Sequence, residues 1–390
     1  MSPQYRHTVL TLCTLAFFAT MVARLTISPV LPDITGWYGV SDSAAGLALT
    51  GMWASYALTQ FPSGLLGDRF GERRVILLAL GLTATAAVLL AFAGSFALFV
   101  LFAVALGAGA GLHYSVATTL LSKQFDQLGR AIGVHIAGGP LAGLVTPVVA
   151  VALATRFGWR VAVLSGALVA LSLFALFAHY VRPTAPTHPG RPVRAGLDLD
   201  AIGPVLSRPE IRYSAFLAAC GAFSWQATAS FLPTFLIEYR GLTQASAGVL
   251  FSLYFVVHGA TQPVMGWLSD RLTRDAAAAL TMGLGVVGFG WLVAGSSLLA
   301  AVGAVLCLGP AMSWGAPVQS RVMDNLTLAE RGSGFGLVRT MYMSVGALGS
   351  VAVGVVADTG GWALAFVGLA FLLLVALASL GANRLFALGY

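Results

Sequence analysis

Two arginines stand inside long apolar stretches of this 390-residue sequence, where a positive charge requires a specific reason. Arg24 lies in the apolar run 8–31, and Arg339 lies in the run 333–357. An arginine in hydrocarbon costs on the order of 2.5–3.5 kcal/mol on insertion scales, so each needs a compensating partner. Because a guanidinium binds a carboxylate or phosphate as a two-pronged fork, the two arginines predict a binding site for a small anion.

Each arginine also has a structural interpretation. Arg24 can pair with a backbone carbonyl or a hydroxyl group inside its own helix. Arg339 lies near the start of its run, so it can extend its head group to the membrane surface or take part in gating.

The composition identifies the environment of these charges. Of all residues, 58% are hydrophobic and only 9% are charged. Soluble domains are about 25% charged and about 45–50% apolar, so this chain lacks the polar surface that solubility requires. We therefore predict an all-α integral membrane protein in contact with the lipid bilayer. Its three cysteines lie within apolar runs without metal-ligand spacing and predict no metal site.

Twelve apolar runs reach the length of about 20 residues that a helix needs to cross the hydrocarbon core. They cover 8–31, 43–66, 75–94, 96–121, 130–154, 159–181, 211–236, 245–268, 276–295, 297–319, 333–357 and 362–385. We expect the first to be a retained span, because it lacks the small-residue cleavage site of a signal peptide.

The basic residues predict the orientation of these spans. Sixteen of the 21 lysines and arginines fall on one side, whereas Arg156, Arg160 and Arg240 fall on the other. The positive-inside rule then puts both termini in the cytoplasm and the protein in the cell (inner) membrane. The net charge of +7 follows from this topology and does not indicate nucleic-acid binding.

The sequence consists of two related halves. A shift of 202 residues lays Gln60, Gly64, Asp68 and Arg69 on Gln262, Gly266, Asp270 and Arg271. Shifts of 201 and 203 residues lay Arg130 on Arg331 and Trp159 on Trp362. Parallel repeats of this kind are a transporter architecture, with the substrate near the membrane midplane between the halves.

The segment between the halves is rich in proline and charge, so we predict that it is a linker. The predicted domains are an N-terminal six-helix bundle over 1–182, a cytoplasmic linker over 183–209 and a C-terminal six-helix bundle over 210–390. The two pseudo-symmetric bundles are expected to surround a central cavity.

The loop between the second and third runs carries a family signature. It reads Gly64-Leu65-Leu66-Gly67-Asp68-Arg69-Phe70-Gly71-Glu72-Arg73-Arg74, and a weaker copy, Gly266-Trp267-Leu268-Ser269-Asp270-Arg271-Leu272, occupies the equivalent loop of the second half. Together with the twelve runs and the long central loop, this closely resembles the major facilitator superfamily over essentially the whole chain. The resemblance says almost nothing about the substrate.

The resemblance implies two conformational latches at the cytoplasmic side. Asp68 would bind the start of the eleventh helix near Ser333, and Asp270 would bind the start of the fifth helix near Arg130. A carboxylate there can accept hydrogen bonds from exposed amides of a helix N-terminus. The alternative is that these are solvated loop charges. The full predicted set for gating is Gly64, Asp68, Arg69, Arg73, Asp270, Arg271, Arg130 and Arg331.

The resemblance also places the first, fourth, seventh and tenth helices around the central path. The repeat pairs Arg24 with Trp225, His113 with Trp314, and Tyr56 with His258. Each aromatic residue has packing as its alternative role. The predicted substrate-binding residues are Arg24, Arg339, Gln226, Trp225, His258, Tyr56, His113 and Trp314.

Two helices bear on the direction of transport. The segment Gly133–Gly143 resembles in part the glycine-proline signature of antiporters in the superfamily, although close helix packing would use the same small residues. The fourth run lacks the arginine that drug–proton antiporters of the family carry, since Ala103 and Ala105 stand in the two possible positions.

Acidic residues are absent from the interior of the predicted spans, although proton-coupled transporters usually carry one there. His113, His135 or His258 could carry the proton instead, because imidazole titrates near neutrality. A hydrogen-bonded structural role is the alternative for each histidine. Anion exchange would need no protein proton relay.

We therefore predict a secondary transporter that moves a small organic anion, in particular a carboxylate, by alternating access through exchange or proton-linked uptake. The alternative is a proton-coupled efflux antiporter for drugs or metabolites. A membrane enzyme or a sensor would need a catalytic cluster or a soluble domain, and the sequence offers neither. We predict no enzymatic activity, no cofactor, a monomer in the bilayer, and a small anionic substrate as the partner.

Overall fold

The computed structural model describes residues 3–125, 128–190, 206–327, 330 and 333–389. Within these ranges all regular structure is helical. Ten of the described helices are long and apolar enough to cross a membrane, judged by length and composition. The all-helical membrane class is thereby supported, whereas the layout of twelve spans in two bundles stays a prediction. Most of the predicted linker, 191–205, lies outside the described residues.

The chain divides into two compact units. Unit 1 contains Met1–Val40 and Gly51–Leu197, and unit 2 contains Ser41–Thr50 and Asp198–Tyr390. The first residues of α3 therefore belong with unit 2, which the predicted domain boundaries did not anticipate.

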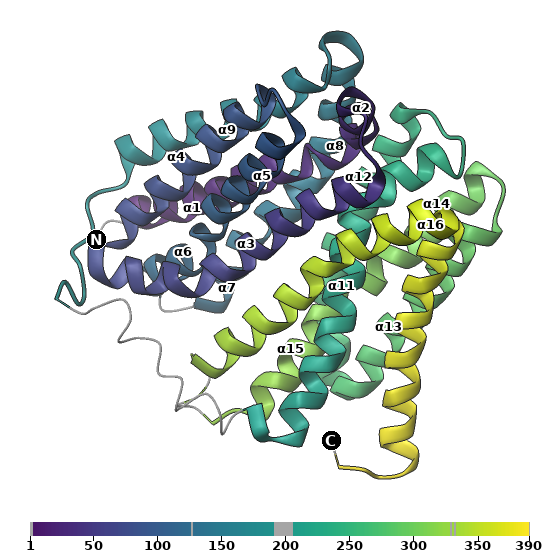
Figure 1. Ribbon diagram of the computed structural model, residues 1–390. Helices are drawn as coiled ribbons and strands as arrows, with labels where there is room; N and C mark the ends of the chain where they lie inside the picture. The colour runs from purple at the N-terminus through teal and green to yellow at the C-terminus, as the bar shows by residue number, and fades with distance from the viewer. Residues whose placement is uncertain (1–2, 126–127, 191–205, 328–329, 331–332, 390) are drawn as a thin grey trace. The chain divides into compact units, whose positions relative to one another are not determined.

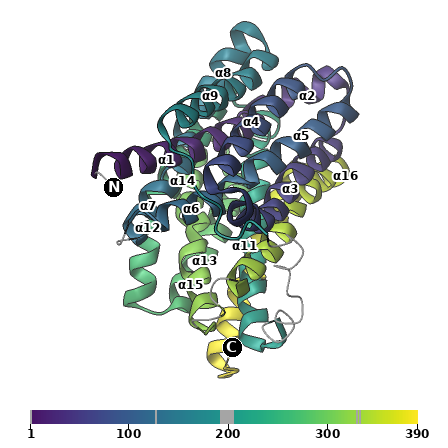
Figure 2. The same ribbon diagram turned by 90° about the vertical axis from the view of Figure 1, so that its left-hand side faces the viewer.

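Helices of unit 1 pack closely around α1 (Figures 1 and 2). Their bounds are α1 Pro3–Leu25, η1 Ser28–Val30, α2 Leu31–Tyr38, α3 Asp42–Phe70, α4 Glu72–Ala91, α5 Phe96–Gly111, α6 His113–Ser122, α7 Leu128–Ile136, α8 Gly138–Phe157 and α9 Trp159–Tyr180. Figure 2 shows α8 and α9 side by side, and both pack against α1. A buried apolar core joins α1, α4, α6 and α9 through residues such as Cys13, Leu80, Val116 and Phe177.

Unit 2 is organised around the pair α11 and α16, which run beside each other in Figure 1. Its bounds are α11 Pro209–Glu238, α12 Gln244–Arg271, α13 Arg274–Ala294, α14 Leu298–Ala311, η3 Met312–Trp314, α15 Gly315–Asp324 and α16 Ser333–Leu385. Large apolar side chains also face outward in both units, for example Leu168 (67% exposed) and Phe371 (64% exposed). Such exposed apolar area is expected where a surface contacts lipid.

Equivalent glycines mark equivalent joints in the two halves. Gly158 separates α8 from α9 with φ 86° and ψ 159°. Gly361 interrupts α16 with φ 84° and ψ 163°, so α16 consists of two helical segments. Both glycines adopt positive φ, which residues with a Cβ atom rarely do, and each precedes a tryptophan. The predicted 203-residue repeat between Trp159 and Trp362 thus has a backbone counterpart.

Four predicted spans contain a local irregularity, although each still lies in one helical stretch long enough to cross a membrane. The run 8–31 ends its first helix at Leu25, and the runs 96–121, 130–154 and 297–319 break at Leu112, Ala137 and Met312–Trp314. Pro140 lacks the amide that would bond the carbonyl of Ile136, and Pro310 has the same effect before η3. A glycine-rich stretch, 107–111, precedes the break at Leu112.

The start of α1 and the end of α9 lie at the same end of unit 1. The backbone amide of Arg182 donates to the hydroxyl of Tyr5 at 2.9 Å. The guanidinium of Arg73 donates to the carbonyl of Ala178 at 2.6 Å. We call this the basic end of unit 1. A chain that enters and leaves a bundle at one end fits an even number of crossings.

Candidate functional site

Arg24 is almost completely buried, with 1% of its surface exposed, in the last turn of α1. Its guanidinium carbon lies 3.9 Å from the ring centre of Tyr56 and 5.1 Å from that of Trp53, both on α3. Cation–π contacts of this kind stabilise a desolvated charge. The sequence analysis put Arg24 and Tyr56 in one predicted substrate-binding set without pairing them. The structure brings these two side chains together, and Trp53 adds a contact that the repeat did not indicate.

The hydrogen bonds of Arg24 are only partly satisfied. Nε donates to the carbonyl of Thr20 at 3.0 Å, and one terminal nitrogen lies 2.9 Å from the sulfur of Met21. The other terminal nitrogen, Nη1, is buried without a hydrogen-bond partner among the described residues. Contacts within α1 thus account for Nε and, through the sulfur of Met21, for one terminal nitrogen. A buried guanidinium that keeps an unpaired donor can bind an anion, because such a donor is costly to leave unsatisfied.

His113 and Trp314, which the repeat pairs, both lie at helix breaks. His113 begins α6, and its Nε2 is 3.2 Å from the carbonyl oxygen of Cys13. Trp314 ends η3 and stands edge-on to Tyr342 at 5.8 Å between ring centres. A Cβ atom at Gly221 would lie 2.4 Å from the indole, so α11 needs glycine there to admit Trp314.

The other predicted substrate residues of unit 2 lie on three helices. Gln226 on α11 is buried and donates to the carbonyl of Met343 at 3.1 Å, while its side-chain oxygen has no partner among the described residues. His258 on α12 stacks on Tyr254 and lies 3.4 Å from the hydroxyl of Ser313. Trp225 on α11 and Arg339 on α16 are half-buried.

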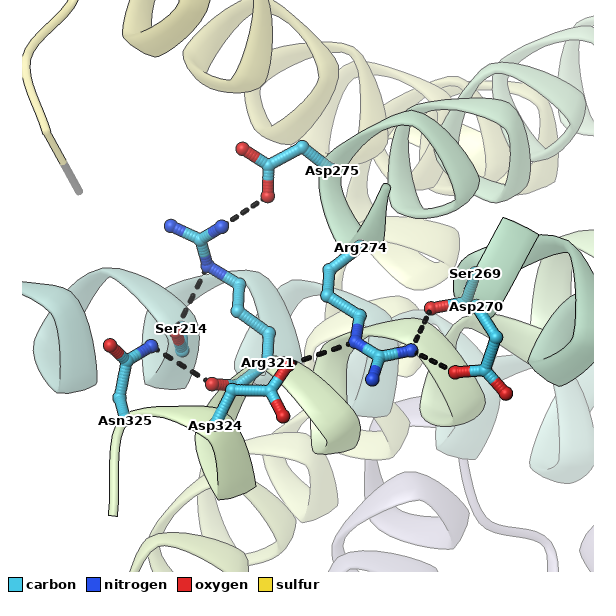
Figure 3. Close-up of polar contacts among 8 residues, drawn as sticks. All are labelled: Ser214, Ser269, Asp270, Arg274, Asp275, Arg321, Asp324 and Asn325. Atoms are coloured by element: carbon cyan, nitrogen blue, oxygen red, sulfur yellow. Dashed lines mark hydrogen bonds and ion pairs between the residues drawn. The ribbon is translucent and has the colours of Figure 1, made fainter. Parts of the chain in front are cut away.

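A network of ion pairs and hydrogen bonds occupies the region of α13 and α15 in unit 2 (Figure 3). Arg274 pairs with Asp270, donates to Asp324 at 2.9 Å and donates to Ser269 at 3.2 Å. Arg321 pairs with Asp275 and donates through Nε to Ser214 at 3.1 Å. Asp270 therefore has a partner inside its own unit, which the latch prediction did not include.

Unit 1 has an equivalent ion pair with the charges exchanged. We call such an ion pair between two helix ends a clamp. Glu72 begins α4 and is fully buried, and its carboxylate lies 2.5 Å from Nζ of Lys123 after α6. A shift of 202 residues takes Glu72 to Arg274, and a shift of 201 takes Lys123 to Asp324. Each half thus ties the start of one helix to the end of another through one ion pair, but with opposite polarity. Aligning the charged residues of the two halves could have revealed this pairing.

The remaining predicted gating residues have varied surroundings. The backbone carbonyl of Asp68 accepts from the amide of His188 at 2.9 Å. The guanidinium groups of Arg69 and Arg271 lie over the rings of the neighbouring Phe70 and Trp267. These contacts tie the loop charges to their own unit. The predicted latches of Asp68 and Asp270 would join the two units, and they stay predictions.

Three other predicted positions add little to the latch hypothesis. Gly64 has open space around it, so close packing does not explain this glycine. Arg130 lines a cavity of about 520 Å³ together with Arg6 and His7. Arg331 lies outside the described residues.

The glycine-proline segment of α8 has a clear packing role. A Cβ atom at Gly138 would lie 2.5 Å from the carbonyl oxygen of Thr14 on α1. Glycine therefore allows α8 and α1 to approach closely, which is the structural interpretation of the partial antiporter signature.

Unit 2 also contains an acidic cluster that the sequence analysis did not single out. The carboxylate of Asp358 accepts hydrogen bonds from the backbone amides of Asp42 (3.1 Å) and Ser43 (2.8 Å) at the start of α3. Glu238 accepts from the indole of Trp362 at 2.8 Å. Burial, together with the negative charges of Glu238 and Asp358, raises the pKa of Asp42 to about 7. Asp358 thus caps a helix N-terminus from a distant part of the chain.

These features describe a polytopic helical membrane protein with a buried arginine and interrupted helices. The model of the Major Facilitator Superfamily matches residues 13–248 and 214–386. The chain therefore belongs to this superfamily, as the loop signature predicted.

Several known proteins resemble the chain. It is 30% identical over 310 residues to a probable nitrate/nitrite antiporter, NarK1, of Thermus thermophilus, covering 74% of this chain and 67% of that protein. It is 30% identical over 157 residues to a probable sulfoacetate transporter, SauU, of Cupriavidus necator, covering 40% of this chain but only 36% of that protein. A voltage-gated purine nucleotide uniporter of mouse, SLC17A9, is 29% identical over 308 residues, with 75% and 66% covered.

Solved structures support the fold. A bacterial homologue of the lysosomal transporter Spinster covers 98% of both chains with a TM-score of 0.83 at 19% identity. The nucleoside transporter NupG gives a TM-score of 0.82 at 13% identity, with 96% of this chain and 99% of that chain covered. At these identities the likeness concerns the fold alone.

The exchanged ion pairs predict a charge-reversal rescue. Glu72→Lys or Lys123→Glu alone should lower the melting temperature of the purified protein by several degrees, because each leaves like charges together at a partly buried site. The double variant should recover at least half of that loss, since it restores a pair of the polarity found at Arg274 and Asp324. A double variant no more stable than the weaker single variant would contradict a direct pairing.

The acidic cluster predicts a pH-dependent stability. Asp42 is neutral below a pH of about 7 in the folded protein, well above its ordinary pKa of 3.8. Its contribution is therefore fully present below a pH of about 3.8 and declines as the pH rises from there to about 7, above which Asp42 is ionised beside the other carboxylates. Thermal unfolding should show this loss in the wild type and not in Asp42→Asn. Asp33→Asn, an exposed carboxylate of α2, is the matched control, and an identical pH profile in all three proteins would refute the assignment.

Proposed function

We propose that this chain is a secondary transporter of small anions, in particular organic carboxylates, which it moves across the cell membrane by alternating access. The observation that carries the proposal is the buried guanidinium of Arg24, which keeps one donor without a partner among the described residues. In a low-dielectric interior an anion is the ligand that best compensates such a group. Three relatives are named as transporters of nitrate and nitrite, of sulfoacetate and of purine nucleotides, and this supports the same class.

The surroundings of Arg24 restrict how the anion binds. Tyr56 covers one face of the guanidinium at 3.9 Å, so a ligand must approach the edge that carries Nη1. An edge-on approach suits a carboxylate or a similar planar oxyanion, whose two oxygens match the guanidinium fork. The buried Trp53 beside the charge favours a substrate with a small apolar or planar body.

The proposed transport cycle uses both halves of the chain. Twelve spans would form two six-helix bundles, with both termini in the cytoplasm and the bundles rocking about a midplane site. Arg339, Gln226, Trp225, His258 and Trp314 would supply the second wall.

The first test is a thermal-shift screen of the detergent-purified protein with carboxylates, sulfonates, nitrate, sugars and cationic drugs. An anion at about 100 times its Kd should add roughly 2.7 kcal/mol to the free energy of unfolding. Arg24→Gln should weaken the binding of that anion by roughly 10- to 150-fold, since a charged hydrogen bond contributes about 1.5–3 kcal/mol. Arg24→Lys should recover only part of the affinity, because an ammonium has no fork.

Arg160→Gln provides the matched control. Arg160 also lies over aromatic rings, those of Trp37 and Trp159, but at the opposite end of unit 1 from the basic end. This variant should bind the anion like the wild type. Stabilisation by cationic or neutral amphiphiles alone, with an equal response from Arg24→Gln, would make Arg24 structural and favour efflux of drugs or metabolites.

The latch hypothesis predicts a separation of rate from affinity. Asp68→Asn should slow uptake into proteoliposomes at least several-fold, because a neutral amide binds a helix N-terminus more weakly than a carboxylate does. Anion affinity should stay within about twofold, since Asp68 lies at the cytoplasmic end of α3 and far from Arg24 in sequence. An equal loss of transport and of binding would rule out a latch.

A further inference from the structure

Two buried histidines lie side by side inside unit 1. His113 is the first residue of α6, and His135 stands near the end of α7. Both are 0% exposed, and their ring centres are 5.4 Å apart. Each stands next to a helix break, at Leu112 and at Ala137. Two segments that are 22 positions apart in the sequence thus place two imidazoles in one apolar interior.

The hydrogen bonding of this histidine pair is incomplete. Nε2 of His113 meets the carbonyl oxygen of Cys13 at 3.2 Å, and the same carbonyl lies near His135. Nδ1 of His113 and both ring nitrogens of His135 have no hydrogen-bond partner among the described residues. Phe17 and Tyr114 fill the space around the rings, at 5.3 Å and 5.8 Å from His135. A purely structural histidine in a core would normally use its polar atoms.

The other ionisable groups near the pair lie on the neighbouring helices. On α1 they are Cys13 and Arg24, on α3 Tyr56, and on α6 Tyr114. On α4, Glu72 is already paired with Lys123 at the basic end, and on α7 Arg130 lies five residues before His135. The helix α5 contributes no ionisable side chain. Within this set only the two imidazoles ordinarily titrate near neutral pH.

We propose that His113 and His135 form a proton-binding site that holds one shared proton and is coupled to anion binding at Arg24. The proposal rests on the proposed function, since it names the coupling ion of the same transporter. Two imidazolium charges at this separation in a low-dielectric interior would repel strongly, so the pair accepts a single proton. The Cys13 carbonyl accepts the hydrogen bond of whichever ring carries it.

The coupling follows from the charge of Arg24, which is near enough to His113 to interact with it electrostatically. A bare guanidinium opposes a second positive charge on the histidine pair. An anion bound to Arg24 offsets that charge, so the proton binds more readily when the anion is present. By linkage, the proton strengthens anion binding by the same factor. A monoanion and one proton would then cross together without moving net charge.

The test counts protons taken up when an anion binds to the full-length protein. Calorimetry with nitrate, methanesulfonate and acetate, in buffers of different ionisation enthalpy, gives this number between about pH 6 and pH 8.5, the range in which histidine titrates. Nitrate and methanesulfonate bind no proton themselves here, so any uptake belongs to the protein. Proton uptake should be greatest between the pKa values of the pair in the free and in the anion-bound protein, where it approaches one proton per anion and affinity rises by up to tenfold per pH unit lowered. Both effects should fade toward the alkaline end, where neither form of the protein holds the proton.

Variants then assign the proton. His113→Gln and His135→Gln should still bind the anion, but proton uptake and the pH dependence of affinity should disappear. His179→Gln is the control, a histidine in the last turn of α9 that lies edge-on to the ring of Tyr180, and it should behave like the wild type. Proton uptake that persists in the double histidine variant would overturn the proposal, and so would anion binding by the wild type without proton uptake. That second result would leave the anion transporter intact, whereas no Arg24-dependent anion binding at all would reject both.

Discussion

A positive charge in an apolar interior must be compensated, and this constraint governs the structure around Arg24. Nearby carboxylates would be the usual partners, yet the described contacts of Arg24 are two aromatic rings, a carbonyl and a sulfur atom. The C-terminal end of α1 adds carbonyl groups whose dipoles favour a cation. Such partners reduce the cost of burial without neutralising the charge. The residual positive potential is available to a ligand, and it also sets the electrostatic environment of the nearby histidine pair.

The ion pairs of the two halves show that both halves keep opposite charges at equivalent positions. Glu72–Lys123 and Arg274–Asp324 occupy equivalent positions with reversed charges. A clamp between two helix ends needs opposite charges at a fixed distance, and either polarity satisfies that need. In unit 2 the clamp extends to Asp270, a residue of the family signature (Figure 3). The signature loop is therefore held to α13 and α15 of its own unit.

Several polar or aromatic residues of the candidate site lie next to the ends of helical segments. Arg24 precedes the end of α1, His113 follows Leu112, His135 precedes Ala137 and Trp314 ends η3. An intact helix saturates its own backbone groups, whereas an interrupted one leaves carbonyls and amides that side chains or ligands can use. The Cys13 carbonyl belongs to the continuous part of α1, and its contact with His113 shows that packing can supply the acceptor instead.

The sequence by itself determined the membrane class, the all-helical character, the family and the buried arginine. These depend on composition, on run length and on a loop motif, all of which are local. The internal repeat matched Trp159 with Trp362, and the structure shows that each of these tryptophans follows a glycine with a positive φ.

Only the tertiary structure decided which groups meet. Trp53 and Tyr56 reach Arg24 from a different helix, His135 meets His113 across a loop, and Asp358 caps α3 from more than 300 residues away. Sequence spacing predicts neighbours along one helix, but contacts between helices depend on the rotation and tilt of each helix. The rotation and tilt are fixed by close packing at small residues such as Gly138 and Gly221. Composition alone does not distinguish a glycine that packs against another helix from one that does not. Packing also buries Asp42 close to Glu238 and Asp358 and so raises its pKa, which its position in the sequence does not indicate.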